Sequence, residues 1–230
     1  MQRDPRPIPI VLVDLDGTVL RHKGGRIAML RAIEDIAGRA ASDADRTSFT
    51  GATDSWIAGE LLRRAGHPGD RAGVDRVHTR YLELLRDGME TYGCAALPGA
   101  QALGEALAKA SADGRCHEPL LLTGNLREGA RRKLSAAGLD HVFRCEGAFG
   151  DRHDDRIDVA REAIALAPGA RHVIIGDAPA DLRAARAVGA RCVLVATGPV
   201  PAEELARLGP DALLDSLLDL ERAMEALLHG

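Results

Sequence analysis

An apolar run near the start of the chain leads directly into two acids. Residues 8–13 (Ile-Pro-Ile-Val-Leu-Val) predict a short buried strand, which is followed by Asp14, Asp16 and Gly17. Alternation along an extended backbone places both acids on one side of the chain where the strand ends, and Gly17 lets the chain turn away. Two carboxylates packed together there repel each other and lose solvation. The pattern therefore predicts a bound cation or a shared proton.

A hard divalent cation with oxygen ligands meets this requirement best, and Mg²⁺ keeps positions open for waters and phosphate oxygens. A bare Asp-x-Asp is more often the polar turn that ends a strand. The longer pattern Asp-Leu-Asp-Gly-Thr at residues 14–18, directly after an apolar strand, is far more specific. We therefore expect magnesium at this end of the strand.

The same pattern resembles the first motif of the haloacid dehalogenase (HAD) superfamily. In members that act on phosphate, the first acid attacks phosphorus and the second is the general acid and base. Asp14 and Asp16 stand at these two positions. Members that cleave carbon–halogen bonds typically lack the second acid, so the resemblance implies phosphoryl chemistry.

Length and charge limit the function classes. The chain has 230 residues, enough for one α/β domain and a smaller inserted one. Its net charge is −4 with acids and bases interspersed, and no basic stripe indicates a nucleic acid or a membrane as partner. The sequence leaves open whether the protein is a monomer or a dimer.

The cysteines and the apolar runs predict a cytoplasmic protein. The first seven residues have no signal-peptide core, and no run is long enough to cross a bilayer. The cysteines are widely spaced, which predicts small apolar residues of a reducing compartment and neither disulfides nor a zinc site. They are Cys94, Cys116, Cys145 and Cys192.

Residues 21–94 predict helices and no convincing strand, whereas strands and helices alternate in the rest of the chain. Helical spacing covers about residues 26–41, a helix with Thr53 as N-cap runs to Gly66, and a third helix covers about residues 71–89. Helices packed on the sheet are the alternative, but roughly seventy residues between consecutive strands is far more than a crossover needs. We therefore predict an α/β fold. A doubly wound, Rossmann-like parallel sheet forms the core at residues 1–20 and 95–230, with an inserted all-helical cap domain at residues 21–94.

In the HAD family a helical cap lies at this place and closes over the site. Thr50–Asp54 resembles a cap loop that reaches toward the substrate. A turn followed by a capped helix accounts for the same residues, so both interpretations stay open.

A second apolar strand, at residues 119–125 (Pro-Leu-Leu-Leu-Thr-Gly-Asn), ends in small polar groups. Thr123 offers a hydroxyl, and the amides near Gly124 and Asn125 precede a helix N-terminus, which favours an anion. A hydroxyl after a strand is commonly only a helix cap. Beside Asp14 it matches the second motif of the family, in which Ser or Thr binds the transferring phosphate. The resemblance therefore implies that these three residues bind phosphate.

A third strand of this kind, at residues 172–177 (His-Val-Ile-Ile-Gly-Asp), ends in Asp177, and Asp181 follows in the next helix. An acid in a first helical turn is stabilised by the helix dipole, which alone would account for Asp181. The pair matches the fourth family motif, in which the first acid binds magnesium and the second supports the metal site. The resemblance implies that Asp14, the Asp16 carbonyl and Asp177 bind Mg²⁺, supported by Asp181. In a doubly wound sheet the carboxyl ends of the strands share one crevice, where these groups can meet.

The chain departs from the third family motif, which is normally a lysine just before a helix. Its lysines are Lys23, Lys109 and Lys133. Lys133 lies ten residues after Thr123 in a predicted helix, and we predict that it faces away from the site. Residues 149–156 (Phe-Gly-Asp-Arg-His-Asp-Asp-Arg) occupy the expected place before a predicted helix at residues 159–166, and we align Arg156 with the family's lysine. Arginine is always charged and can hold phosphate bidentately. Arg152 is the rival, and a solvated loop of mixed charge is the alternative for the whole segment.

Together these residues predict a magnesium-dependent phosphomonoester hydrolase that forms an aspartyl-phosphate on Asp14. The substrate is expected to be a small phosphorylated metabolite. Length and cap position resemble the phosphoglycolate phosphatase-like branch of the superfamily. A phosphosugar mutase on the same core and a non-catalytic binding or regulatory module are the alternatives. The sequence predicts neither the substrate itself nor the cap residues that contact it.

Overall fold

The computed structural model describes residues 7–44 and 48–229. A parallel sheet of six strands in the order β5-β4-β1-β6-β7-β8 forms its centre. The bounds of these strands are Gly147–Ala148, Leu120–Leu122, Pro9–Val13, Arg171–Gly176, Arg191–Val195 and Ala212–Leu214, in that order across the sheet. The predicted α/β fold with a Rossmann-like parallel sheet is confirmed.

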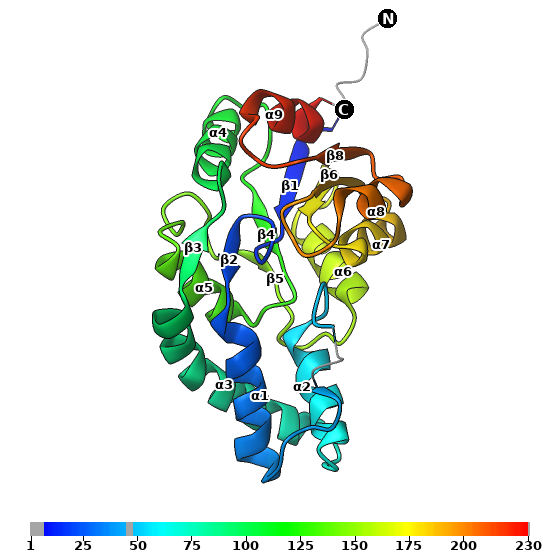
Figure 1. Cartoon of the computed structure of the whole chain (residues 1–230). Helices are drawn as coiled ribbons and strands as arrows, with labels where there is room; N and C mark the ends of the chain where they lie inside the picture. Colours follow the sequence, from blue (N-terminus) through cyan, green and yellow to red (C-terminus); the bar gives the residue numbers. More distant parts are fainter. Residues whose placement is uncertain (1–6, 45–47, 230) are drawn as a thin grey trace, which may run out of the picture.

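Helices cover both faces of this sheet (Figure 1). Val11 and Val13 of β1 pack with α4 (Ala100–Ala112), α5 (Arg127–Ala136) and α9 (Leu220–Leu228). Ile10 and Leu12 point the other way, toward α6 (Arg156–Leu166), α7 (Pro179–Val188) and α8 (Ala202–Arg207). Successive side chains of a strand alternate between the two faces, so a wholly apolar strand such as β1 is stable only between two helical layers.

Three further helices pack together beyond the carboxyl edge of the sheet, at the bottom of Figure 1. They are α1 (Gly24–Ala37), α2 (Asp54–Arg64) and α3 (Arg71–Tyr92), and they share their own apolar cluster. A short antiparallel pair, β2 (Leu20–His22) and β3 (Cys94–Ala96), lies where the chain leaves the large sheet and returns to it. The sequence did not predict this pair, because three residues are too few for a periodic pattern. The division into a core and a cap domain at residues 20/21 and 94/95 stays a prediction.

The N-terminus of α2 is held directly on the sheet end by hydrogen bonds. Thr53 caps this helix as predicted, since its hydroxyl oxygen accepts a hydrogen bond from the Trp56 amide at 3.2 Å. The Asp54 amide donates to the Gly124 carbonyl at 2.7 Å. Ser55 Oγ donates to the Gly150 carbonyl at 2.6 Å. The segment after residue 48 therefore lies close to the residues that follow β4 and β5.

None of the helices in the described part of the chain has the length and apolar character that crossing a bilayer requires. Residues 45–47 lie outside the described residues. Residues 1–6, on which the expectation of a missing signal peptide rests, lie outside them as well.

Candidate active site

Asp14 and Asp16 follow β1 at the centre of the sheet. Because β1 pairs with β4 on one side and β6 on the other, its carboxyl end lies between Thr123 and Asp177. The chain turns away at Gly17, whose φ of 85° is readily adopted only by glycine. The structure thus brings together the three strand ends from which the sequence predicted a site.

Arg156, the first residue of α6, points into the same edge of the sheet and is buried. Its Nη2 atom lies 2.7 Å from Asp14 Oδ1 and 2.7 Å from Asp181 Oδ1. It also donates to the Leu122 carbonyl at 3.1 Å. Arg152, the rival for this position, is exposed. The guanidinium therefore faces the acid that the sequence predicts to attack phosphorus.

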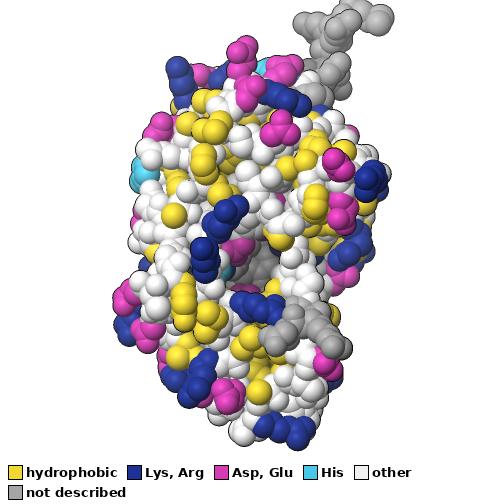
Figure 2. Space-filling model, in the orientation of Figure 1, with side chains coloured by type: hydrophobic (Ala, Val, Ile, Leu, Met, Phe, Trp, Pro, Cys, Tyr) yellow, Lys and Arg dark blue, Asp and Glu magenta, His cyan; other side chains and the backbone are white. Residues whose placement is uncertain are grey.

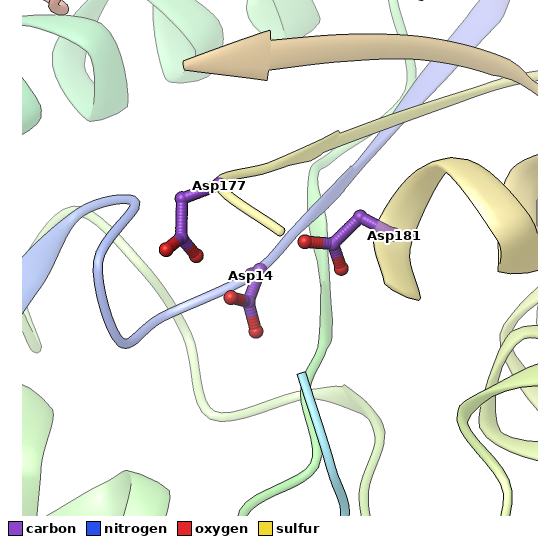
Figure 3. Close-up of side chains that lie close together, drawn as sticks. All are labelled: Asp14, Asp177 and Asp181. Atoms are coloured by element: carbon purple, nitrogen blue, oxygen red, sulfur yellow. The ribbon is translucent and has the colours of Figure 1, made fainter. Parts of the chain in front are cut away.

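Asp14, Asp177 and Asp181 form a cluster of buried carboxylates, with one oxygen of each within 4.8 Å of the others. Figure 3 shows the three side chains converging from the ends of β1 and β6 and from the first turn of α7. Burial raises the pKa of Asp177 to about 8, and the charges of Asp14 and Asp181 add to the effect. Burial also raises the pKa of Asp14 to about 6, although Arg156 opposes this shift. Three carboxylates share one guanidinium, so the cluster lacks positive charge.

The negative charge of the cluster and the space that two glycines leave beside it both fit a divalent cation. Carboxylate oxygens are the ligands that Mg²⁺ prefers. The Asp177 carboxylate lies against two glycines, and a Cβ at Gly17 or Gly198 would come within 2.4 Å or 1.6 Å of its Oδ2 atom. Asp181 is engaged by protein at both oxygens, because Oδ2 accepts a hydrogen bond from the Ala178 amide at 3.0 Å and Oδ1 faces Arg156. The Asp16 carboxylate is not part of the cluster, and its carbonyl as a metal ligand stays a prediction.

Asp16 instead belongs to a second polar group on the other side of Asp14. Its Oδ2 atom lies 2.7 Å from Lys133 Nζ and accepts a hydrogen bond from Asn125 Nδ2 at 2.8 Å. Its Oδ1 atom lies 3.2 Å from His22 Nε2. Asn125 Nδ2 also donates to Thr123 Oγ1 at 2.6 Å. Burial opposes ionisation, but Lys133 and His22 together hold the pKa of Asp16 well below its usual range.

The prediction that Lys133 faces away from the site is wrong. Its side chain is buried and its ammonium contacts both Asp16 and Asn125. The sequence did carry a signal for this placement, because Lys133 lies seven residues after Leu126, on the same face as Ala130. A helical side chain also points back toward the N-terminus of its helix, which here is the end nearest the site.

A cavity of about 450 Å³ opens beside these two groups. Figure 2 shows this face hollowed between the sheet end and the three lower helices, with basic side chains on both sides of the hollow. The core lines it with Asp14, Asp16, Thr123, Gly124, Asn125, Lys133, Arg156 and Asp177. The segment from His22 to Tyr81 lines the opposite side with Met29, Phe49, Ile57 and the loop before Asp54, among others. Thr50–Asp54, interpreted from the sequence as a cap loop, therefore lies in the wall of this cavity.

The N-terminus of α5 is already occupied by two acids of the chain itself. The Leu126 amide donates to Asp54 Oδ2 at 2.9 Å, and the Arg127 amide donates to Asp151 Oδ2 at 2.9 Å. Burial raises the pKa of Asp54 to about 6, although Lys133 opposes the shift. Asp54 was interpreted from the sequence as a helix-start residue or as the end of a cap loop, and neither interpretation predicted this contact. Its carboxylate now joins α2 to the residues that follow β4.

Comparison with known proteins agrees with this geometry. The family model described as HAD-hydrolase-like matches residues 153–220, which include Arg156, Asp177 and Asp181. The protein named "Putative pyrophosphatase PpaX" of Caldanaerobacter subterraneus subsp. tengcongensis is 28% identical over 232 residues, and the match covers 93% of each chain. These two likenesses support a phosphatase of the HAD superfamily.

Solved structures share the fold of this chain. CbbY from Rhodobacter sphaeroides, solved in complex with phosphate, has a TM-score of 0.66 at 24% identity and covers 93% of this chain and 96% of its own. A predicted phosphoglycolate phosphatase from Haemophilus somnus 129pt has a TM-score of 0.64 at 18% identity, with 94% and 97% covered. Both likenesses are likenesses of fold.

Proposed function

We propose that this HAD chain is a magnesium-dependent phosphomonoester hydrolase that acts on a small phosphorylated metabolite through an aspartyl-phosphate. The observation that carries the proposal is the buried Asp14 carboxylate, which lines the cavity with Arg156 2.7 Å away. The family assignment and the phosphatase-named relatives support the coarser statement that the chain is a phosphatase of HAD type.

Asp14 is the nucleophile in this proposal. One of its oxygens attacks phosphorus in line, the bond from phosphorus to the leaving oxygen breaks, and the phosphoryl group is held on the carboxylate. Arg156 and the Thr123 hydroxyl offset the charge on the phosphoryl oxygens. Their contacts with Asp14 and Asn125 keep these groups in place before substrate arrives.

Asp16 moves the proton in both steps. Lys133 and His22 hold the pKa of Asp16 low in the empty site, and the negative charge of a bound phosphate raises it. Asp16 then gives a proton to the leaving alcohol in the first step and takes one from the hydrolytic water in the second. Its carboxylate lines the cavity two residues after the nucleophile, so a single side chain can serve both steps.

Asp14 and Asp177, supported by Asp181, would hold Mg²⁺, with the Asp16 carbonyl as a further ligand. When bound, Mg²⁺ offsets the charge that gathers on the phosphoryl group and polarises its oxygens. Asp181 contacts Arg156 and so keeps the guanidinium turned toward Asp14.

The test is a screen of phosphorylated metabolites with Mg²⁺, in which free phosphate is measured. We expect phosphate release by the wild type and none by Asp14→Asn. Release that continues in Asp14→Asn at the wild-type rate would overturn the proposal. Turnover that requires a bisphosphate primer would indicate a mutase, and binding of a phosphorylated metabolite without turnover would indicate a binding module.

A further inference from the structure

Lys133 is a buried lysine at a position that none of the family motifs occupies. Its side chain is 3% exposed, and its ammonium lies 2.7 Å from Asp16 Oδ2. The same ammonium donates a hydrogen bond to Asn125 Oδ1. A charged group is costly to bury away from water, so its contacts must compensate for lost solvation. Both of its partners line the cavity.

The ammonium determines which way the Asn125 amide faces. A lysine ammonium can only donate hydrogen bonds, so the atom of Asn125 that faces it must be the oxygen. The amide nitrogen is then turned to the other side. There it donates to Asp16 Oδ2 at 2.8 Å and to Thr123 Oγ1 at 2.6 Å. Reversing the amide would set its oxygen against a carboxylate oxygen.

The orientation of Asn125 in turn frees the Thr123 proton. Because Thr123 Oγ1 accepts a hydrogen bond from the amide, its own hydrogen is left to donate to another group. At the other end, Asp16 Oδ2 receives Lys133 and Asn125 together, while Oδ1 faces His22. The two hydrogen bonds to Oδ2 therefore fix the rotation of the Asp16 carboxylate.

We propose that Lys133 is a positioning residue that fixes, through one ammonium, both the Asp16 carboxylate and the phosphate-binding hydroxyl of Thr123. In this arrangement two cationic side chains lie near the nucleophile, and each contacts different groups. Arg156 contacts Asp14 and Asp181, and Lys133 contacts Asp16 and Asn125. The inference rests on the proposed function, because it assigns Asp16 and Thr123 their roles in phosphoryl transfer.

The first test replaces Lys133 with methionine, which keeps most of the side-chain volume and removes the charge. Lys109, exposed on α4, supplies the matched control Lys109→Met. We expect Lys133→Met to lower kcat/KM about a hundredfold with an unactivated alkyl phosphate. The leaving group of p-nitrophenyl phosphate departs unprotonated, so the position of Asp16 does not affect this rate. We expect a loss of about tenfold with this ester, because the Thr123 hydroxyl is no longer directed at phosphate. Lys109→Met should match the wild type with both substrates.

A role of Lys133 in packing alone would lower both rates by the same factor. Equal losses with the two substrates, or wild-type rates in Lys133→Met, would overturn the inference. Calorimetry with inorganic phosphate adds a measurement independent of turnover. We expect affinity for phosphate to fall about tenfold in Lys133→Met, because the Thr123 hydroxyl is no longer directed.

The second test compares Asn125→Asp with Asn125→Ala and does not depend on the folding of a Lys133 variant. An aspartate keeps the shape of the side chain and strengthens the contact with Lys133. It also places an oxygen against Asp16, and the Thr123 hydroxyl then donates its proton to this aspartate and not to phosphate. We therefore expect Asn125→Asp to be no more active than Asn125→Ala. Higher activity of Asn125→Asp than of Asn125→Ala would overturn the inference.

The two proposals fail in distinguishable ways. If the wild type neither binds inorganic phosphate nor releases it from any ester, the proposed function fails. If the wild type turns over, and Asp16→Asn loses more activity with the alkyl phosphate than with p-nitrophenyl phosphate, the proposed function stands. Failure of Lys133→Met to show that same difference then rejects only the positioning role of Lys133.

Discussion

The Nη2 atom of Arg156 lies 2.7 Å from Asp14 Oδ1, and both side chains are almost wholly buried. The pair places a permanent positive charge beside the carboxylate that we propose attacks phosphorus. Where the family motif has a lysine, a planar guanidinium here reaches Asp14 and Asp181 with the same nitrogen. Its Nε atom has no hydrogen-bond partner among the described residues.

Removal of this guanidinium should damage catalysis strongly. Arg156→Ala leaves Asp14 and the phosphate dianion opposed only by the metal, a loss of about 2–4 kcal/mol in the transition state, or roughly thirty- to thousandfold in kcat/KM. The melting temperature should fall as well, because the change leaves the buried Asp181 carboxylate unpaired. Steady-state kinetics and thermal unfolding measure the two effects.

Arg156→Lys and Arg152→Ala serve as the controls for this prediction. The lysine restores the charge without the planar fork and should recover part of the rate. Arg152 is exposed on the same loop, so its removal should be close to neutral. A silent Arg156→Ala together with a damaging Arg152→Ala would reverse our alignment of the loop with the third family motif.

The strand ends were predictable from the sequence because parallel strands share one edge. Asp14, Thr123 and Asp177 each follow an apolar run, and the topology leaves them no other place to meet. Lys133 was not predicted, although it lies in register with Leu126 on the inner face of α5. A lysine in a helix is usually solvated, and only the tertiary structure shows that its stem reaches back to Asp16.

Asp14→Asn should abolish turnover and leave the fold intact. The amide is nearly isosteric with the carboxylate but cannot form the acyl phosphate. The change also removes one charge from a cluster in which three carboxylates share one guanidinium. We therefore expect the metal-free variant to melt at or above the wild-type temperature at about pH 8. A melting temperature well below that of the wild type would contradict the claim that repulsion among these carboxylates destabilises the metal-free protein.

Magnesium affinity should depend on pH through Asp177. Its pKa in the metal-free fold is raised from 3.8 to about 8, so the folded protein holds a proton that the unfolded chain releases. The stabilising contribution of this proton is full below about pH 4 and is lost as the pH rises through about 8. Mg²⁺ must displace the same proton. Apparent affinity measured by calorimetry should therefore increase from about pH 6 to pH 8, by up to roughly tenfold per unit.

Asp177→Asn tests that assignment. An asparagine carries no proton to displace, so the remaining affinity for Mg²⁺ should be weak and nearly independent of pH over the same range. Chelation with EDTA should abolish wild-type activity, and added Mg²⁺ should restore it. Activity that persists after chelation would argue against a metal at the cluster of Asp14, Asp177 and Asp181.

Tyr81 is our candidate for a contact with the leaving group. It lines the cavity from α3, and no hydrogen bond within the described part of the chain involves its hydroxyl. Tyr81→Phe should raise KM for the best substrate about three- to tenfold, the value of one neutral hydrogen bond, with kcat nearly unchanged. An unchanged KM would place the leaving group elsewhere in the cavity.

The cap side of the site could not be predicted in this detail from the sequence. Asp54 and Ser55 fit the start of a capped helix, and that local role hides their contacts with Leu126 and Gly150. Those contacts join segments about seventy and ninety-five residues apart in the chain. A local pattern carries no information about partners at such separations.

Gly124 tests whether the seating of α2 on the sheet end matters for activity. A Cβ at this glycine would lie 2.2 Å from the Ala52 carbonyl oxygen, so Gly124→Ala should push the Thr50–Asp54 loop away. The matched control is Gly129→Ala within α5, where the nearest side-chain atoms are 3.7 Å away and alanine favours the helix. We expect faster hydrogen exchange at the Asp54 amide and a clear loss of kcat/KM in Gly124→Ala, and neither change in Gly129→Ala. If exchange at Asp54 stays at the wild-type rate while activity falls, Gly124 acts on the phosphate directly and the seating of α2 is not what limits turnover.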